Sequence, residues 1–238
     1  MQFNWNDQLL QKLPKVRKLI ESSAASTVTT VLLGETGVGK EYVADLIHQH
    51  SSRVSNPFVK ISCVGFADDV IDSELFGHVR GAFTGATDNR VGLLESAHGG
   101  TLLIDEIGDM SLKLQAKLLR FLQDGEIRPV GSSKTRHINV RMLLATRRNL
   151  EQLVASGQFR DDLYYRISDL HITIPPLRDR PEELRPLALL FTGQAAKEFG
   201  REVPEISEIQ HAVWARLPWP GNVREIRSAC RRHVLLGE

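Results

Sequence analysis

The stretch VLLGETGVGKEYVADLIHQ, residues 31–49, decides the fold. An apolar run of strand length enters a glycine-rich turn, and the turn opens into a segment with an apolar helical face. A G-x-x-x-x-G-K pattern between a strand and a helix is typical of a phosphate-binding loop, because its glycines let backbone N–H groups point inward and the helix N-terminus adds positive charge. We therefore predict a nucleotide site in which Lys40 reaches the β- and γ-phosphates. The residues expected to line this site are Gly34, Glu35, Thr36, Gly37, Val38, Gly39, Lys40 and Glu41.

The position after Lys40 holds Glu41 rather than a Ser or Thr, whose hydroxyl normally ligates Mg²⁺. Another carboxylate must then serve the metal, and Asp105 and Glu106 follow an apolar run in GTLLIDEI, residues 100–107. Asp105 suits Mg²⁺, directly or through water, and Glu106 suits the orientation and deprotonation of an attacking water. Acidic residues at the end of a buried strand are costly to leave unpaired. Hydrolysis of ATP is therefore the leading predicted chemistry.

Short apolar runs alternate with helical patterns from Val28 up to Pro175-Pro176. This alternation predicts an α/β fold with a parallel central sheet flanked by helices. Beyond the prolines only helical patterns remain, so we predict an α/β subdomain over residues 1–175 and a small α-helical subdomain over residues 176–238. Gly125 suits the end of a helix that begins near residue 112. The predicted strands lie within residues 27–35, 57–64, 100–107, 138–146 and 170–177.

The composition is that of an ordinary globular protein, with 42% hydrophobic residues, 25% charged residues and a formal net charge of +1. So small a charge argues against a surface built throughout for nucleic acid, and the arginine-rich segment 224–233 is interpreted as a solvated helix face. Cys63 and Cys230 have no metal-binding or redox spacing, which suits a reducing compartment. The sequence has no apolar run of about 20 residues and no signal-peptide pattern, so we predict a cytoplasmic protein without a membrane partner.

One hexapeptide indicates which class of ATP-hydrolysing protein this sequence resembles. GAFTGA, residues 81–86, resembles the hexapeptide of bacterial enhancer-binding proteins, the AAA+ ATPases that activate transcription by sigma-54 RNA polymerase. GETGVGKE, GGTLLIDEIGDM, GQFRDDLYYRI and WPGNVREI also resemble segments of that family, in its order, and the resemblance covers about residues 10–235. It implies an AAA+ P-loop NTPase with a helical lid, ATP and Mg²⁺ as ligands, and a homo-oligomeric ring, which is a hexamer in the family. A clamp loader or protein-unfolding AAA+ would explain the phosphate-binding loop but not the hexapeptide.

The resemblance also implies roles for individual residues. In the family the hexapeptide tips a loop that contacts sigma-54 in the RNA polymerase holoenzyme, and the ATP state moves this loop so that the closed complex is remodelled and promoter DNA melts. Arg160 and Arg166 match the arginine fingers that reach a neighbouring subunit's nucleotide, and Arg224 matches the sensor II arginine. At the tip, Phe83 offers an apolar contact and Thr84 a polar one. The expected contact residues are Gly81, Ala82, Phe83, Thr84, Gly85 and Ala86.

Three positions depart from the family pattern. Ser62 stands where the family usually has an Asn that holds the catalytic glutamate in an inactive pose, and the shorter serine could hydrogen-bond Glu106. Arg147 follows Thr146 where the family usually has Asn or His, so it could contact phosphate or pair with Glu106. Val79 replaces a common Glu. We expect Ser62, Thr146 and Arg147 to tune hydrolysis, and they keep open an alternative: a nucleotide-gated assembly or regulatory module with weak or absent hydrolysis.

Family members usually carry an N-terminal sensory domain and a C-terminal helix-turn-helix that binds promoter DNA. Residues 1–27 are too short for a sensory domain, and the chain stops at Glu238, where a linker to a DNA-binding domain would start. We therefore interpret the chain as an excised domain whose input signal and target promoters are specified elsewhere.

Overall fold

The computed structural model describes residues 13–236, and these form two compact units. Residues 13–19, 34–40 and 173–236 form the first, which we call the helical unit. Residues 20–33 and 41–172 form the second, which we call the sheet unit. The phosphate-binding loop therefore belongs to the helical unit, and Asp105 and Glu106 belong to the sheet unit. The functional division at residue 176 remains a prediction.

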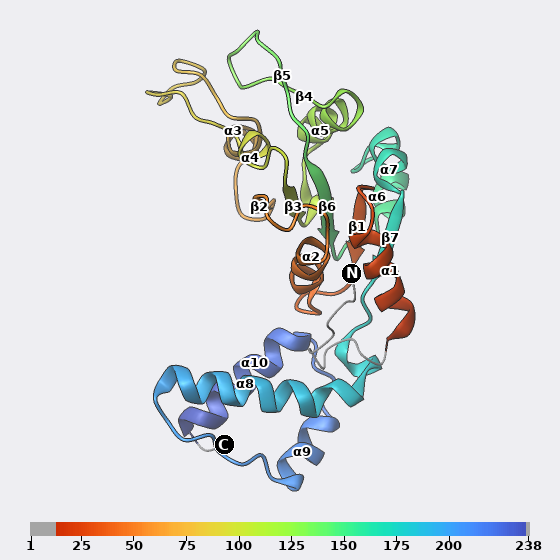
Figure 1. The fold of residues 1–238 in the computed structure, drawn as a ribbon, viewed down its shortest axis with the longest axis vertical. Coiled ribbons are helices and arrows are strands. Elements are labelled where there is room, and N and C mark those ends of the chain that lie inside the picture. The colour runs from red at the N-terminus through yellow and green to blue at the C-terminus, as the bar shows by residue number, and fades with distance from the viewer. Residues whose placement is uncertain (1–12, 237–238) are drawn as a thin grey trace. The chain divides into compact units, whose positions relative to one another are not determined.

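A five-stranded sheet forms the centre of the sheet unit (Figure 1). Its strands are β1 (Thr30–Leu33), β2 (Phe58–Ser62), β3 (Thr101–Asp105), β6 (Arg141–Thr146) and β7 (Leu170–Thr173). Their order is β2-β3-β6-β1-β7, and the β2-β3, β3-β6 and β6-β1 pairs are parallel. β3 and β6 are buried almost throughout, as expected for parallel strands that are covered on both faces. The five predicted strands and the parallel sheet are confirmed.

Helices flank this sheet and join its strands. They are α1 (Pro14–Ala24), α2 (Lys40–Gln49), α3 (Asp68–Phe76), α4 (Leu93–Ser96), α5 (Leu112–Asp124), α6 (Leu150–Ala155) and α7 (Asp161–Ile167), together with the 3-10 turn η1 (Ile107–Asp109). In α5, the Ser111 hydroxyl accepts a hydrogen bond from the Leu114 N–H at the first turn. Gly125 ends the helix in the left-handed conformation with φ 69°, which confirms the predicted stop. The buried face of α5 includes Leu118, which is fully enclosed in the main apolar core.

A short hairpin that the sequence analysis missed follows α5. β4 (Glu126–Ile127) pairs antiparallel with β5 (Arg136–His137), and α5 lies beside β4 (Figure 1). Strands of two residues are too short to show the alternating apolar pattern that reveals a longer strand. The loop between them, residues 128–135, contains Pro129 and Gly131, which are turn-forming residues.

The helical unit has its own apolar core. Its helices are α8 (Leu184–Phe199), α9 (Glu208–Ala215) and α10 (Asn222–Leu236), preceded by the 3-10 turns η2 (Leu177–Asp179) and η3 (Pro181–Glu183). α8 and α10 pack side by side (Figure 1), and Trp214 and Trp219 meet edge to face in the core with ring centroids 6.2 Å apart. From residue 174 to residue 236 the structure contains no strand, which confirms the predicted helical segment. Over residues 13–236, no helix is both long and apolar enough to cross a membrane.

Candidate nucleotide site and partner loop

The phosphate-binding loop lies between β1 and α2 and adopts a conformation that only glycines tolerate well. Gly34, Gly37 and Gly39 have φ values of 153°, 78° and 108°. A Cβ on Gly37 would lie 2.3 Å from the Gly221 carbonyl oxygen, and one on Gly34 would lie 2.8 Å from the Ile174 carbonyl oxygen. A glycine-rich turn that opens a helix directs backbone N–H groups at an anion, so this loop fits phosphate.

Lys40 is the first residue of α2 and is almost fully buried. Its Nζ donates to the Gly34 carbonyl at 2.9 Å and to the Glu35 carbonyl at 3.3 Å, so the ammonium lies over the loop itself. Glu41, the next residue, turns away to pair with Lys60 of β2 at 2.9 Å. The Glu41 carboxylate therefore neutralises Lys60 in this structure. Any contact of Glu41 with the nucleotide is left to its backbone.

The acidic pair lies at the carboxyl end of β3. Asp105 is opposite Ser62 in the β2-β3 ladder, and its Oδ1 accepts from the Glu106 N–H at 3.0 Å. Glu106 follows with φ 54°, an uncommon left-handed conformation for a residue with a side chain, and it is 9% exposed. Strained backbone of this kind persists where the surroundings hold it, and it is frequent at functional sites.

Glu106 is held by the end of β6. The Arg147 backbone N–H donates to Glu106 Oε2 at 3.0 Å, whereas the Arg147 side chain is exposed. Thr146 Oγ1 accepts from the Arg148 N–H at 3.0 Å and so shapes the turn that presents this amide. Ser62 Oγ accepts from the Val64 N–H at 3.3 Å. The pairing of Arg147 with Glu106 thus runs through the backbone rather than through the guanidinium.

Cys63 reports on the electrostatics of this edge of the sheet. Its N–H donates to the Asp105 carbonyl at 3.0 Å, and its side chain is 4% exposed. Burial, followed by the charges of Asp105, Asp109 and Glu106, raises the pKa of the Cys63 thiol to about 12. The thiol is therefore inert at neutral pH, and the local field is negative, which suits a cation such as Mg²⁺.

The two predicted arginine fingers lie at the ends of α7. The Arg160 guanidinium binds Asp162 through both oxygens, with Nε–Oδ1 and Nη2–Oδ2 distances of 3.0 and 2.7 Å. Arg166 donates to the Leu122 carbonyl at the end of α5, with Nε–O and Nη2–O distances of 3.1 and 2.5 Å. Both side chains are therefore held within their own subunit here.

The sensor II candidate, Arg224, is exposed in the first turn of α10. A Cβ on Gly37 would lie 3.1 Å from Arg224 Cβ, so the arginine stands next to the phosphate-binding loop. The Val223 N–H also donates to the Gly37 carbonyl at 3.0 Å. Both contacts lie within the helical unit.

GAFTGA forms the tip of the loop between α3 and α4. The Gly81 N–H donates to the Ala86 carbonyl at 2.9 Å, which closes the hexapeptide, and Gly81 and Gly85 have φ values of 80° and 100°. Phe83 is 45% exposed, and its ring meets His78 edge to face with centroids 5.0 Å apart. The tip therefore presents a half-exposed aromatic ring on a backbone whose glycines allow it to change shape.

The base of this loop is bonded to the β4-β5 loop. The Val79 N–H donates to the Val130 carbonyl at 3.1 Å, and the Val130 N–H donates to the Gly77 carbonyl at 2.8 Å. Gly131 has φ 77°, and a Cβ on it would lie only 2.7 Å from Ala82 Cβ. The hexapeptide thus rests directly on the hairpin loop.

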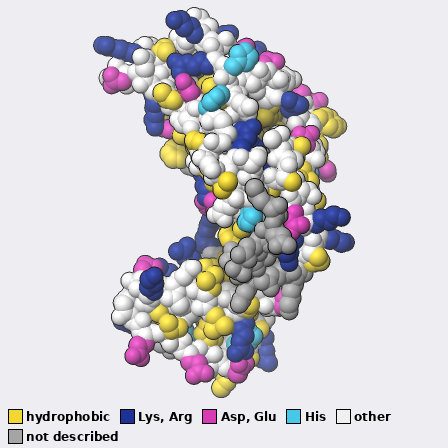
Figure 2. Space-filling view, viewed as in Figure 1, with side chains coloured by type: hydrophobic (Ala, Val, Ile, Leu, Met, Phe, Trp, Pro, Cys, Tyr) yellow, Lys and Arg dark blue, Asp and Glu magenta, His cyan; other side chains and the backbone are white. Residues whose placement is uncertain are grey.

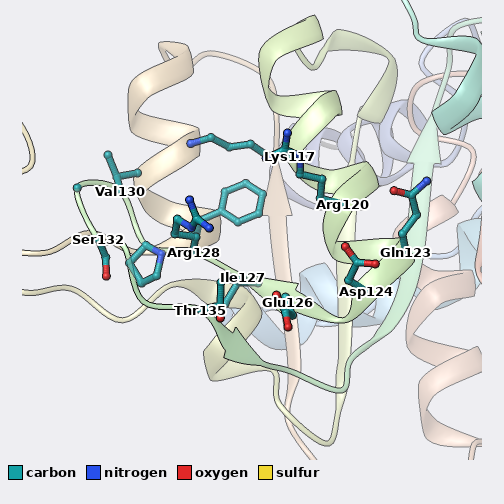
Figure 3. A pocket seen from close by; sticks show the side chains of 13 residues that line it. Lys117, Arg120, Gln123, Asp124, Glu126, Ile127, Arg128, Val130, Ser132 and Thr135 are labelled. Atoms are coloured by element: carbon teal, nitrogen blue, oxygen red, sulfur yellow. The ribbon is translucent and has the colours of Figure 1, made fainter.

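A pocket of 640 Å³ opens between α5 and the hairpin (Figure 3). Lys117 and Arg120 reach it from α5, and Arg128 reaches it from the residue after β4. Lys117 is neutralised by the buried Asp72, with Nζ–Oδ2 at 2.6 Å. Figure 2 shows lysine and arginine side chains at the end of the sheet unit from which the loop and the hairpin project. Asp124 and Glu126 also line the pocket, so its lining carries charges of both signs.

Three residues that the sequence analysis did not single out contact the phosphate-binding loop. Arg178 binds Glu35, Arg180 donates to the Val38 carbonyl, and Asn222 donates to the Thr36 carbonyl. These residues lie in the segments PPLRDRPEEL and WPGNVREI. Local sequence patterns do not reveal the contacts, because each contact joins positions more than 140 residues apart.

The arrangement matches known proteins along nearly the whole chain. The family model described as the sigma-54 interaction domain matches residues 8–173, and an AAA+ ATPase lid domain model matches residues 178–238. The chain belongs to the sigma-54 interaction domain family. This sigma-54 interaction domain is 46% identical over 224 residues to the nitrogen fixation protein VnfA of Azotobacter vinelandii, a match that covers 94% of the chain and 43% of the relative. It is also 44% identical over 233 residues to the alginate biosynthesis transcriptional regulatory protein AlgB of Pseudomonas aeruginosa, covering 97% of the chain and 52% of that protein.

Solved structures agree with the AAA+ architecture of the sigma-54 interaction domain. NtrX from Brucella abortus, crystallised in complex with ATP, has a TM-score of 0.87 and 35% identity over 96% of this chain and 52% of that one. NtrX with ADP has a TM-score of 0.88 and covers 95% of this chain and 49% of that one. The domain spans about half the length of these proteins, so the rest of each relative lies outside the match.

Proposed function

We propose that this domain hydrolyses MgATP within a ring of like subunits and uses the cycle to move the GAFTGA loop against sigma-54. The closed complex of RNA polymerase holoenzyme would be remodelled in consequence, so that promoter DNA melts. The observation that carries the proposal is the half-exposed Phe83 at the tip of a glycine-hinged loop whose base is bonded to the β4-β5 loop. The glycines allow the tip that carries Phe83 to change shape, while hydrogen bonds hold the base of the loop to the β4-β5 loop. A loop that transmits force needs both properties.

The phosphate-binding loop and Lys40 supply the positive charge for the phosphates in this proposal. The loop N–H groups and the N-terminus of α2 face an anion without the cost of ordering flexible side chains. Mg²⁺, when bound, would neutralise charge on the β- and γ-phosphates, and it usually takes one or two protein carboxylates together with waters and phosphate oxygens. Asp105, at the negative edge of the sheet, is the residue we assign to it.

Glu106 is the proposed general base. It would take a proton from water while the water oxygen bonds to the γ-phosphorus and the bond from that phosphorus to the bridging oxygen breaks, releasing ADP and phosphate. The hydrogen bond from the Arg147 N–H to Glu106 Oε2 gives the domain a way to hold this carboxylate until the segment after β6 rearranges. Thr146 and Ser62 would tune that arrangement through the two strand ends that flank Asp105.

Arg160 and Arg166 are the proposed fingers for the neighbouring subunit's γ-phosphate. Such an arginine is worth about 10³–10⁵ in rate, because it offsets charge in the transition state. To act in trans, both must exchange their present partners, Asp162 and the Leu122 carbonyl, for phosphate oxygens. Closure of this head-to-tail contact would give a cyclic ring, which we propose to be a hexamer. Arg224 would sense the nucleotide from α10.

Two properties of the full-length protein, its recognition of promoter DNA and its compartment, are also proposals. VnfA and the transcriptional regulatory protein AlgB are about twice as long as this domain, so we assign recognition of promoter DNA to sequence outside it and propose the cytoplasm as its compartment. A second candidate is a nucleotide-gated assembly module with weak hydrolysis. The bond that holds Glu106 to the Arg147 amide, together with Ser62 in place of a larger amide side chain, favours it.

Phe83→Ala tests the proposed role of the loop. The variant should keep its ATPase rate within about twofold and lose both sigma-54 binding and open-complex formation, since the ring touches no part of the nucleotide site's described contacts. Phe66→Ala is the matched control, because Phe66 is a more exposed phenylalanine of the same unit. Normal open-complex formation by Phe83→Ala would refute the assignment.

A further inference from the structure

The strongest unassigned feature is a set of charged and amide side chains that clasp the phosphate-binding loop from within the helical unit. Four consecutive residues of the loop, Glu35 to Val38, each receive at least one hydrogen bond from η2, its following residue or the start of α10. Every one of these contacts joins segments of the same compact unit. We call this set of contacts, made by Arg178, Arg180, Asn222 and the Val223 N–H, the clasp. The clasp is therefore part of the structure of the phosphate-binding loop.

The contact between Arg178 and Glu35 is the charged part of the clasp. Arg178 Nη1 donates to Glu35 Oε2 at 2.9 Å and Nη2 donates to Oε1 at 2.6 Å, a bidentate geometry that fixes both planes. Asn222 Nδ2 donates to the same Oε2 at 3.2 Å. These bonds lower the pKa of Glu35 to about 2, with the Arg178 bond as the larger cause and the Asn222 bond next. The carboxylate is thus kept ionised at every physiological pH.

A permanent carboxylate in a loop that binds polyphosphate needs an explanation. Two like charges a few ångström apart repel each other, and the repulsion is stronger at the effective dielectric of a protein surface than in water. Glu35 is the second residue of the loop, so its negative charge acts on any phosphate that the loop N–H groups hold. The guanidinium of Arg178 cancels this charge at its source.

Asn222 and the buried ion pair of Arg180 with Glu183 provide the rest of the framework. Asn222 is fully buried in a left-handed conformation with φ 52°, and its Oδ1 accepts from the Leu177 N–H at 2.8 Å while Nδ2 donates to the Thr36 carbonyl at 3.1 Å. Arg180, paired with the buried Glu183, donates to the Val38 carbonyl at 2.6 Å. These bonds fix the Thr36 and Val38 carbonyls of the loop.

We propose that Arg178 is a positioning and affinity-determining residue for the nucleotide, acting through Glu35 to cancel the repulsion between that carboxylate and the phosphates. The proposal rests on the proposed ATP site and deepens it. The reason to keep a carboxylate at residue 35 is geometric: it ties η2 to the loop through two rigid hydrogen bonds. Loss of Arg178 alone leaves the Glu35 carboxylate uncompensated beside the phosphates. Loss of both Arg178 and Glu35 removes that carboxylate together with its two hydrogen bonds to η2.

The test is a double-mutant cycle on nucleotide affinity, measured by titration calorimetry with ATP and with ADP. Arg178→Gln should raise the Kd for ATP about tenfold, from the repulsion of one uncompensated charge, and should raise the Kd for ADP by less because ADP carries one charge fewer. Glu35→Gln should lower the Kd for ATP, because it leaves the positive charge of Arg178 uncompensated beside the phosphates. The double variant should bind ATP within about threefold of the wild type.

Arg185→Gln is the matched control. Arg185 lies in the same unit, pairs with Glu208 at 2.8 Å and is exposed to a similar degree as Arg178. The substitution therefore removes one positive charge from the unit without changing a contact of the phosphate-binding loop. It should leave the Kd unchanged. The ratio of Kd values between Arg178→Gln and wild type should also shrink at 1 M salt, where the Debye length is about 3 Å. A purely structural role would give neither the salt effect nor the rescue.

Two outcomes overturn the inference. A double variant that binds ATP as weakly as Arg178→Gln would show that Arg178 acts without Glu35, and an unchanged Kd in Arg178→Gln would show that it does not act at all. Both are distinct from failure of the proposed function, in which the wild-type chain itself would bind neither ATP nor ADP. A thermal melt of each variant checks that it is folded.

Discussion

Gly131→Ala should uncouple the GAFTGA loop from the rest of the domain. Gly131 has φ 77°, and its added Cβ would lie 2.7 Å from Ala82 Cβ and 3.0 Å from Ala82 Cα. Carbon atoms in contact prefer about 3.5–4.0 Å, so either the hairpin loop or the hexapeptide must move by about 1 Å. The left-handed backbone conformation costs a further 1–2 kcal/mol once a Cβ is present.

Gly99→Ala separates these two effects. Gly99 has the same φ of 77°, but a Cβ there would meet nothing within 4 Å. Both variants should therefore share a backbone cost of about 1–2 kcal/mol, which lowers Tm by about 2–8 °C for a chain of this size. Only Gly131→Ala should displace the hexapeptide.

The assay compares three quantities in the two variants: Tm, steady-state ATPase rate and open-complex formation with sigma-54 RNA polymerase. We expect Gly131→Ala to form open complexes at least about tenfold less well than Gly99→Ala, because a displacement of 1 Å at a working contact can cost about 10²-fold. Their ATPase rates should agree within about threefold. Equal open-complex formation by the two variants would refute the reasoning.

Three further predictions follow from burial and charge. Leu118→Ala, at a fully buried position of α5, should cost about 2–5 kcal/mol in urea unfolding, whereas Leu112→Ala, at an exposed position of the same helix, should stay within about 0.5 kcal/mol. The contact with Arg178 depresses the folded-state pKa of Glu35 to about 2, so its stabilisation is fully present above the ordinary value of 4.5 and is lost as the pH falls from 4.5 toward 2. The unfolding midpoints of wild type and Glu35→Gln should therefore differ by a constant amount between pH 5 and 8 and converge below pH 4.5; a difference that grows in acid would contradict the assignment. Iodoacetamide at pH 8 should label Cys63 far more slowly in the native protein than in urea, because burial and carboxylates hold its thiol pKa near 12; equal labelling rates would show that this thiol is accessible.

Local patterns in the sequence predicted the sheet and the position of Asp105 at the end of one of its strands. The apolar runs that end at Leu33, Ser62, Asp105 and Thr146 are strands in the structure, and their parallel pairing places Ser62 opposite Asp105. Gly125 ends its helix because the left-handed conformation suits glycine. These features depend on periodicity and backbone preference, which act over a few residues.

Contacts between distant segments could not be predicted in the same way. The bonds from Arg180 to Val38 and from Asn222 to Thr36 span more than 140 residues, and no local pattern records them. The prediction that Arg147 could pair with Glu106 named the right residue, but the backbone amide makes the bond, since the side chain extends to solvent. The β4-β5 hairpin escaped notice because it has only two residues in each strand.

The central claim is that this domain hydrolyses ATP with residues supplied by two subunits. The most direct test is the steady-state ATPase rate per subunit as a function of protein concentration, with Glu106→Ala as the control. A rate that rises with concentration and vanishes in the variant is the predicted result, because the proposed role of Arg160 and Arg166 is to complete a neighbouring subunit's nucleotide site. A flat rate at the level of the variant, across the concentrations at which the chain assembles, would contradict the account and favour the nucleotide-gated assembly module.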